Sequence, residues 1–96
     1  MKIIIRTRYG DILVRAHKIV IPGFERFDFF ATICPTNIIS SKYTITEFRS
    51  GATVCSGKSF KEVFTKSVLR LNILGIGEVE KAIDKRIKAY GIANTK

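Results

Sequence analysis

Basic side chains at alternate positions are the residues of this sequence best suited to chemistry. Five of them share a strand-like spacing near the start of the chain: Arg6, Arg8, Arg15, His17 and Arg26. Residues two apart in an extended strand point to the same face, so we expect these cations on one face of a sheet. Guanidinium groups bind phosphate oxygens in a bidentate manner, and accessible aromatic rings stack nucleic-acid bases. With Tyr9 and Phe30 expected on the same face, the pattern predicts a phosphate-binding surface.

A second interpretation of this face stays open. One face of an antiparallel sheet is commonly solvated, and alternating cations suit such a face without any ligand. The segment Arg26–Ile33 also lacks the glycines that are typical of an RNA-recognition strand. The sequence therefore allows both a binding face and a merely hydrated basic face.

Side chains suited to catalysis or metal binding are few. His17 is the single histidine, and no Ser, Cys or carboxylate lies at a catalytic motif spacing from it. Cys34 and Cys55 form no C-x-x-C pattern, so a structural zinc site is not predicted. We expect both cysteines to be reduced thiols packed among apolar side chains. We predict a protein without catalytic residues, metal or cofactor, and therefore not an enzyme.

Positive charge is the strongest global property of the sequence. Seventeen Lys and Arg against eight Asp and Glu give a formal net charge of +9, shared evenly between the two halves of the chain. A positive folded surface favours polyanionic partners and speeds encounters with them, although it also aids solubility without any partner. We predict nucleic acid or an acidic protein surface as the partner.

The elements that would position these residues begin with strands. Five runs have β-rich composition and are bounded by turn residues: Lys2–Arg8, Ile12–Ile21, Phe24–Ile33, Tyr43–Arg49 and Ala52–Cys55. The first two predict a hairpin, and the last two predict another about Gly51, where glycine supplies a positive φ. Cys34–Lys42 is expected to be a connection. The apolar positions expected to face the helices are Ile3, Ile5, Ile12, Val14, Phe27 and Phe29.

The pattern changes to a helical period at Ser59. Ser59 and Glu62 fit a capping box, and an apolar stripe follows. Asn72–Gly77 interrupts the stripe, and a second helix is predicted over Glu78–Tyr90, ended by Gly91. We therefore predict an α+β fold, a single domain over residues 1–96, in which an antiparallel meander of four to five strands packs on two C-terminal helices.

The interruption between the helices supports a further hypothesis. Leu71-Asn72-Ile73-Leu74-Gly75-Ile76-Gly77 resembles the hairpin of the helix-hairpin-helix family, whose turn presents backbone amides to a DNA phosphate. The resemblance covers the last third of the chain and implies phosphate binding at Gly75 and Gly77. Glu78 and Glu80 depart from the family pattern, because they place negative charge where a phosphate would approach. An ordinary glycine-containing connection between helices is the alternative.

A longer resemblance covers Tyr43–Gly51 and Val54–Val63. These residues are similar to a strand–turn–strand–helix unit found in short phage and mobile-element proteins. The matching residues are those that form the fold, so the resemblance implies no activity by itself. It implies a context in which small inhibitors of host nucleases and other defence factors occur.

The location follows from what the sequence lacks. No apolar run approaches the roughly 20 residues of a membrane-spanning helix, and Met1–Tyr9 lacks the residue order of a secretory signal. We expect a cytoplasmic protein without membrane contact. The leading prediction is a small basic binding protein that contacts nucleic acid through phosphates. The alternatives are an inhibitor or adaptor that docks on an acidic surface of a host protein, and a structural subunit of a larger assembly.

Overall fold

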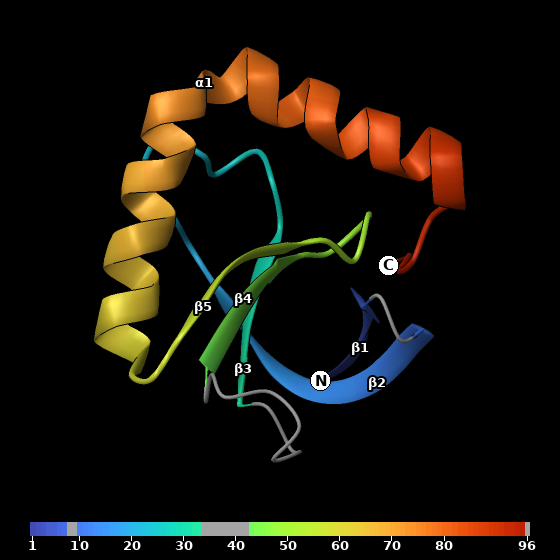
Figure 1. Cartoon of the computed structure of the whole chain (residues 1–96), viewed down its shortest axis with the longest axis horizontal. Coiled ribbons are helices and arrows are strands. Elements are labelled where there is room, and N and C mark those ends of the chain that lie inside the picture. The colour runs from blue at the N-terminus through green and yellow to red at the C-terminus, as the bar shows by residue number, and fades with distance from the viewer. Residues whose placement is uncertain (8–9, 34–42, 96) are drawn as a thin grey trace.

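The protein consists of a five-stranded antiparallel sheet and one long bent helix (Figure 1). The computed structural model describes residues 1–7, 10–33 and 43–95. Its elements follow one another along the chain as β1 (Lys2–Thr7), β2 (Gly10–Ile19), β3 (Phe29–Ile33), β4 (Tyr43–Glu47), β5 (Thr53–Gly57) and α1 (Phe60–Tyr90). The strand order in the sheet equals the chain order, so the predicted α+β fold with an antiparallel meander is confirmed. The predicted connection over Cys34–Lys42, including Cys34, lies outside the described residues.

Strand β2 bends and belongs to two parts of the sheet. Its first half pairs with β1, where Val14 lies opposite Ile3, and its second half pairs with β3, where His17 lies opposite Ala31. Figure 1 shows β2 as a strongly curved ribbon that carries β1 away from β3 and β4. The β1–β2 hairpin therefore folds across one face of the remaining sheet.

Apolar side chains are buried on both faces of the sheet. The face toward α1 carries the larger core, whose most buried members are Ile21, Phe24, Phe29, Ile45, Val63 and Leu71. The opposite face carries a second core, made of Ile3, Ile5, Val14, Ala16, Phe30 and Phe48. Phe29 and Phe30 are neighbours in β3, and they enter different cores because a strand alternates its side chains between faces.

The second core corrects part of the sequence prediction. Three residues expected to face the helices pack there instead: Ile3, Ile5 and Val14. The cause is the bend of β2, which turns the inner side of the hairpin toward Phe30 and Phe48. Phe27 and Phe29 do lie on the helix side, whereas Ile12 is 38% exposed.

The third strand is shorter than its apolar pattern predicts. Strand β3 begins at Phe29, not at Phe24. Between β2 and β3 the chain turns twice: the Phe24 N–H donates to the Ile21 carbonyl (3.0 Å), and the Phe27 N–H donates to the Phe24 carbonyl (3.1 Å). Ile21 and Phe24 are buried, so this segment fills the core without joining the sheet. An apolar run can fill either role, and its composition alone does not separate them.

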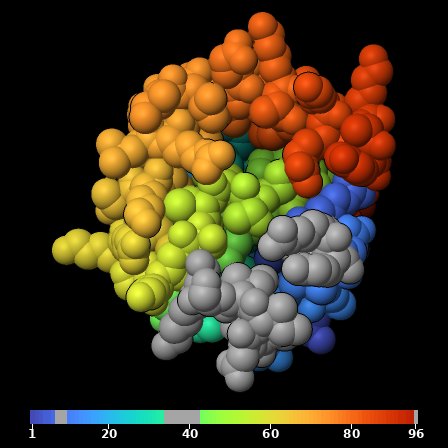
Figure 2. All heavy atoms as spheres, viewed as in Figure 1, coloured from blue at the N-terminus to red at the C-terminus, as the bar shows by residue number. Residues whose placement is uncertain are grey.

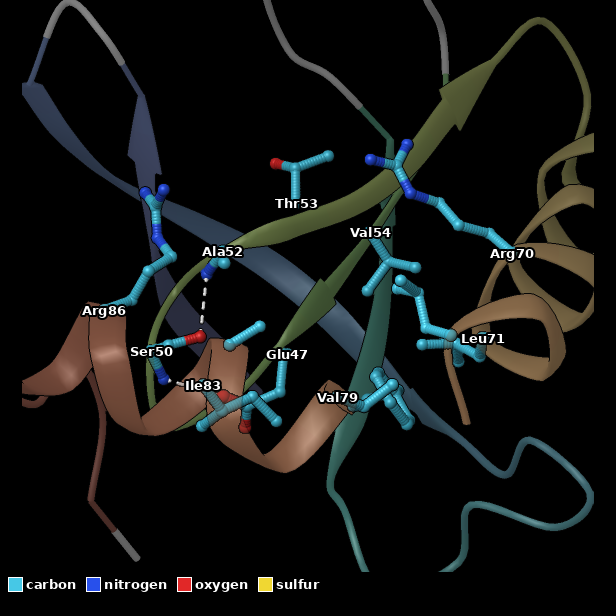
Figure 3. A pocket seen from close by; sticks show the side chains of 13 residues that line it. Glu47, Ser50, Ala52, Thr53, Val54, Arg70, Leu71, Val79, Ile83 and Arg86 are labelled. Carbon is cyan, nitrogen blue, oxygen red and sulfur yellow. Dashed lines mark hydrogen bonds between the residues drawn. The ribbon is translucent and has the colours of Figure 1, made fainter. Parts of the chain in front are cut away.

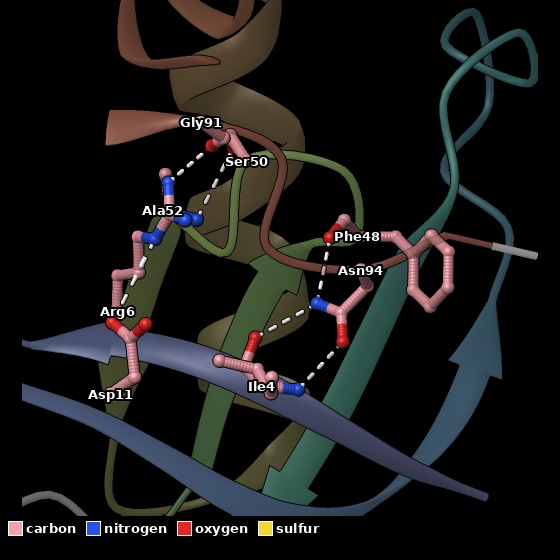
Figure 4. A network of polar contacts seen from close by, with 8 residues as sticks. All are labelled: Ile4, Arg6, Asp11, Phe48, Ser50, Ala52, Gly91 and Asn94. Atoms are coloured by element: carbon pink, nitrogen blue, oxygen red, sulfur yellow. Dashed lines mark hydrogen bonds and ion pairs between the residues drawn. The ribbon is translucent and has the colours of Figure 1, made fainter. Parts of the chain in front are cut away.

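The segment after α1 joins the first strand to the residues that follow β4 (Figure 4). The Asn94 side-chain amide donates to the carbonyls of Ile4 (2.9 Å) and Phe48 (2.8 Å), and its Oδ1 accepts from the Ile4 N–H (2.8 Å). The Ala93 N–H also donates to the Arg49 carbonyl (2.7 Å). Asn94 therefore satisfies both backbone groups of Ile4 at the edge of β1, as a neighbouring strand would.

The turn between β4 and β5 depends on Gly51 and on a buried carboxylate. Gly51 has the predicted positive φ, 69°, and a Cβ there would lie 2.9 Å from the Ala93 Cβ. Glu47 is 3% exposed, and its carboxylate accepts from the N–H groups of Arg49 (2.8 Å) and Ser50 (2.9 Å). Glycine thus allows the C-terminal segment to approach the turn, and Glu47 satisfies the turn amides.

Helix α1 is one element with a kink at Gly75. Its start confirms the Ser59 half of the predicted capping box, because the Glu62 N–H donates to Ser59 Oγ (3.2 Å), whereas the Glu62 carboxylate accepts from Lys66 Nζ. The prediction of two helices with a connection over residues 72–77 is wrong, since only Gly75 leaves helical geometry (φ 80°, ψ 159°). A straight helix of 31 residues would be about 46 Å long, whereas the longest dimension of the molecule is 34 Å.

The kink divides α1 into a first arm (residues 60–74) and a second arm (residues 76–90). Val63 and Leu71 from the first arm and Val79 and Ile83 from the second enter the same core. Both arms therefore lie against one face of the sheet.

We expect opposite effects from alanine at the two glycines of the helix. Gly75→Ala should lower the free energy of unfolding by about 1–3 kcal/mol, because its backbone conformation is essentially restricted to glycine. Gly77→Ala should raise it by about 0.5–1 kcal/mol, because Gly77 is helical and alanine reduces the entropy of the unfolded chain. Open space surrounds both positions, so side-chain clashes do not confuse the comparison. Urea denaturation followed by circular dichroism measures both, and equal effects would contradict the kink.

Removal of the Asn94 amide should loosen the closure of the sheet. Asn94→Ala leaves both backbone groups of Ile4 without this partner, and we expect a loss of about 2 kcal/mol in the free energy of unfolding. Thr95→Ala is the control, because Thr95 is an exposed neighbour on the same segment. Equal urea midpoints for the two variants would show that the C-terminal segment is not docked in solution.

Candidate functional site

Two of the predicted phosphate-binding arginines have structural roles. The Arg6 side chain is 13% exposed, and its Nε lies 3.7 Å from Asp11 Oδ1. Its Nη1 also donates to the Gly91 carbonyl at the end of α1 (Figure 4). Arg26 lies in the turn segment before β3 and reaches toward α1, where its Nη2 is 2.9 Å from Glu80 Oε1. Both guanidinium groups therefore already have anionic partners within the fold.

The predicted stacking aromatic is not accessible. Phe30 is 4% exposed, and its ring centroid lies 5.2 Å from that of Phe48. The prediction that Phe30 lies on an open face is wrong, because the β1–β2 hairpin covers that face. Two further members of the predicted region, Arg8 and Tyr9, lie outside the described residues.

A smaller part of the predicted basic face remains open on the outer side of β2. Arg15 and His17 are exposed on this strand, and Lys2 of β1 lies directly opposite Arg15. Leu13 (63% exposed) and Ile33 (58% exposed) border them, and a shallow hollow of about 300 Å³ runs along this side. We call Lys2, Arg15 and His17 the β2 basic surface.

The two glycines of the predicted hairpin, Gly75 and Gly77, have different structural roles. Gly75 makes the kink in α1, and Gly77 is an exposed helical residue. Residues 72–77 therefore form no separate hairpin between two helices. Glu78 lies 3.6 Å from Lys81, and Glu80 is paired with Arg26, so both acidic departures from the family pattern are engaged within the fold.

A groove that the sequence did not reveal lies inside the bend of α1 (Figure 3). Its volume is about 220 Å³, and its floor is largely apolar, with Ala52, Val54, Leu71, Leu74, Val79 and Ile83 among its lining. Arg70 of the first arm and Arg86 of the second arm project to the same side of the groove, on either side of Thr53. We call this feature the helix-bend groove. Gly75, where the helix bends, was the one sequence signal for this groove.

Acidic side chains are largely engaged within the fold. Five of them form ion pairs with basic side chains: Asp11, Asp28, Glu62, Glu78 and Glu80. Glu47 accepts from backbone amides instead. Within the described ranges, no ion pair is recorded for Arg15, Arg70 or Arg86. The excess positive charge is therefore presented at the surface by cations without an ion-pair partner, such as these three arginines.

One exposed pair on α1 shows how these local ion pairs act. Lys66 Nζ lies 2.8 Å from Glu62 Oε1. This hydrogen bond lowers the pKa of the Glu62 carboxyl and raises the pKa of the Lys66 ammonium. Each group therefore stays charged over a wider pH range, and the pair contributes little net charge to the first arm.

The outer side of the helix bend carries apolar side chains in solvent. Leu69 is 60% exposed and Ile73 is 84% exposed, and as residues four apart they share a face of the first arm. Ile76, just beyond the kink, is 40% exposed. We call these three residues the apolar apex. Exposed apolar side chains at nearby positions of a helix are a feature of many interaction surfaces.

Other kinds of site leave no trace in the described part of the chain. His, Cys, Asp and Glu side chains there do not gather in groups of three or more that could hold a metal ion. Cys55 is a half-buried free thiol. Across these same residues, α1 lacks an apolar stretch of the length and hydropathy needed to cross a bilayer.

Comparison with known proteins adds no relative. No protein-family model, no curated protein and no solved structure matches the chain.

A substitution at Phe30 tests its assignment to the second core. Phe30→Leu should lower the free energy of unfolding by about 1–2 kcal/mol, because a smaller side chain leaves space against Phe48. His17→Leu, in the neighbouring strand, should change stability by less than about 0.5 kcal/mol, because His17 is exposed. Thermal or urea denaturation measures both. A Phe30→Leu variant as stable as the parent protein would contradict the burial of Phe30 in the second core.

Proposed function

We propose that the protein is a small non-enzymatic binding protein that contacts nucleic acid through its phosphates. The observation that supports this function is the uncompensated charge of the β2 basic surface. Arg15 is exposed, has no recorded ion-pair partner in the described ranges, and lies between Lys2 and His17. Asp11, the acidic residue on the same strand, is already paired with Arg6.

The chemistry of this surface predicts the kind of binding. Arg15 offers a bidentate donor to a phosphate, and Lys2 offers a point charge beside it. With Phe30 buried, no described aromatic ring lies on this surface to stack bases. Phosphate contacts position a protein without reading sequence, so we expect weak binding with little base preference.

A second candidate function is docking on an acidic surface of another protein. The net positive charge supports an acidic surface, and the apolar apex supports a protein as the partner, because Leu69 and Ile73 are exposed and do not add to the core. An inhibitor or adaptor that binds a host nuclease, as expected from the mobile-element resemblance, would use such a surface. Either function is compatible with the cytoplasmic location that we expect.

The first candidate is tested by salt-dependent binding to a labelled single strand of about 20 nucleotides. Three neutralised phosphates would give a slope of about −2 when log affinity is plotted against log salt. Arg15→Glu should weaken binding roughly tenfold at low salt and flatten that slope. Lys85→Glu is the matched control, since Lys85 is an exposed cation on the second arm. Absence of binding by the parent protein at low ionic strength would contradict the proposal.

A pull-down separates the two candidates. Tagged protein recovered from lysate before and after nuclease treatment should lose its partners if nucleic acid bridges them. A protein partner that survives nuclease treatment, and is lost from an Ile73→Glu variant, supports docking at the apolar apex instead.

A further inference from the structure

Strand β5 ends the sheet and lies open between the arms of α1. Within the described residues it pairs only with β4. Figure 2 shows the yellow-green surface of this region in a hollow bordered by the two arms of α1, in orange and red. The strand Thr53–Gly57 contains no charged residue and no proline, the usual means of blocking a sheet edge. Thr53 is exposed and residues 54–56 are half-buried, so this edge is partly accessible and is not protected by a charged residue or a proline.

The side chains around this edge favour a ligand that is both acidic and apolar. Arg70 and Arg86 flank Thr53 at the rim of the helix-bend groove (Figure 3). The Arg86 guanidinium lies 5.5 Å from the centroid of the Tyr90 ring, which helps to hold it in place. Between the two cations the groove is apolar, with Leu71 and Val79 in its lining. A ligand along β5 therefore meets positive charge on both sides and an apolar floor between.

We propose that the edge of β5 binds an extended acidic segment of a partner protein as an added strand. Its backbone would pair with the outward N–H and C=O groups of β5. Acidic side chains would lie against Arg70 and Arg86, and an apolar side chain between them would enter the groove. This inference rests on the second candidate function, docking on a protein, and names the segment that the protein recognises.

The edge is less suited to nucleic acid or to a second copy of this chain. A strand edge presents carbonyl oxygens as well as N–H groups, and the carbonyls repel phosphate oxygens while accepting hydrogen bonds from a peptide. Pairing of β5 with the β5 of another copy would bring no carboxylate to the arginines, because Thr53–Gly57 contains no Asp or Glu. An acidic peptide satisfies both the edge and the arginines.

The probe for this proposal is a blocked peptide that contains Glu-Thr-Val-Thr-Glu, in which the two glutamates and the valine share one face of an extended strand. Titration into ¹⁵N-labelled protein should shift the amide resonances of residues 53–56 in a saturable manner. The matched lysine–valine peptide, with lysine in place of both glutamates, should bind at least roughly tenfold more weakly, because it loses two ion pairs and gains repulsion. A glutamate–valine peptide with N-methylated amides keeps the charge but cannot pair as a strand, and it should not bind.

Matched variants test the arginines. Combined Arg70→Glu and Arg86→Glu should weaken binding of the glutamate–valine peptide roughly tenfold or more. Combined Lys61→Glu and Lys85→Glu makes the same charge change at exposed positions outside the groove and should have a much smaller effect. Circular dichroism of both double variants confirms that the helix is retained before binding is compared.

Three results would overturn the proposal. They are no saturable shift at residues 53–56, equal binding of the lysine–valine peptide, and equal binding of the N-methylated peptide. The nucleic-acid assay remains separate, because it depends on Arg15. If the Arg70 and Arg86 variant loses nucleic-acid binding while the peptide fails to bind, the groove is a phosphate site and the strand-addition proposal is wrong.

Discussion

The bend of β2 is the constraint on which the rest of the structure depends. A sheet with Phe29 on one face and Phe30 on the other must cover both, and a single helix covers only one. Strand β2 solves this by pairing with β3 in its second half and carrying β1 over the other face in its first half. Burial of the second core offsets the cost of bending the strand, since apolar burial is the main favourable term in folding.

Closure by the C-terminal segment follows from this bend. A hairpin that folds over the sheet leaves the backbone of β1 without a strand on its outer side, and buried backbone groups need partners. Asn94 supplies them for Ile4 and at the same time bonds to Phe48, a member of the second core. The Arg6 bond to the Gly91 carbonyl adds a link between the same two segments. The end of the chain thus holds its beginning in place.

The bend also decides which predicted binding residues remain available. It buries Phe30 and brings Arg6 beside Asp11 and Gly91, while it leaves Arg15 and His17 on the convex side of β2. Local signals predicted what depends on neighbours in sequence: the strand periods, the Ser59 cap and the positive φ of Gly51. They did not predict the bend, because alternation shows which side chains share a face but not what covers that face. The adjacent Phe29 and Phe30 were the available signal that both faces are buried.

The helix-bend groove was beyond prediction for a related reason. Its walls combine β5 with residues on two arms of α1, and only the kink at Gly75 brings the second arm back to the sheet. The sequence marked a break over residues 72–77 but gave no angle, and a longer connection would have placed Arg86 elsewhere. Because only one residue leaves helical geometry, both arms stay helical up to the kink. Arg70 and Arg86 therefore line the same groove.

Folding explains the kink but not everything that surrounds it. Val79 and Ile83 need the bend to reach the core, and their burial offsets a backbone conformation that only glycine adopts readily. The same bend does not require apolar residues on its outer side, because Ile73 is 84% exposed and does not belong to the core. An apolar side chain kept in water at that position costs solubility without adding stability. The fold of the described residues therefore gives no reason for the apolar apex, and the protein docking proposed as the second candidate function is one that would use it.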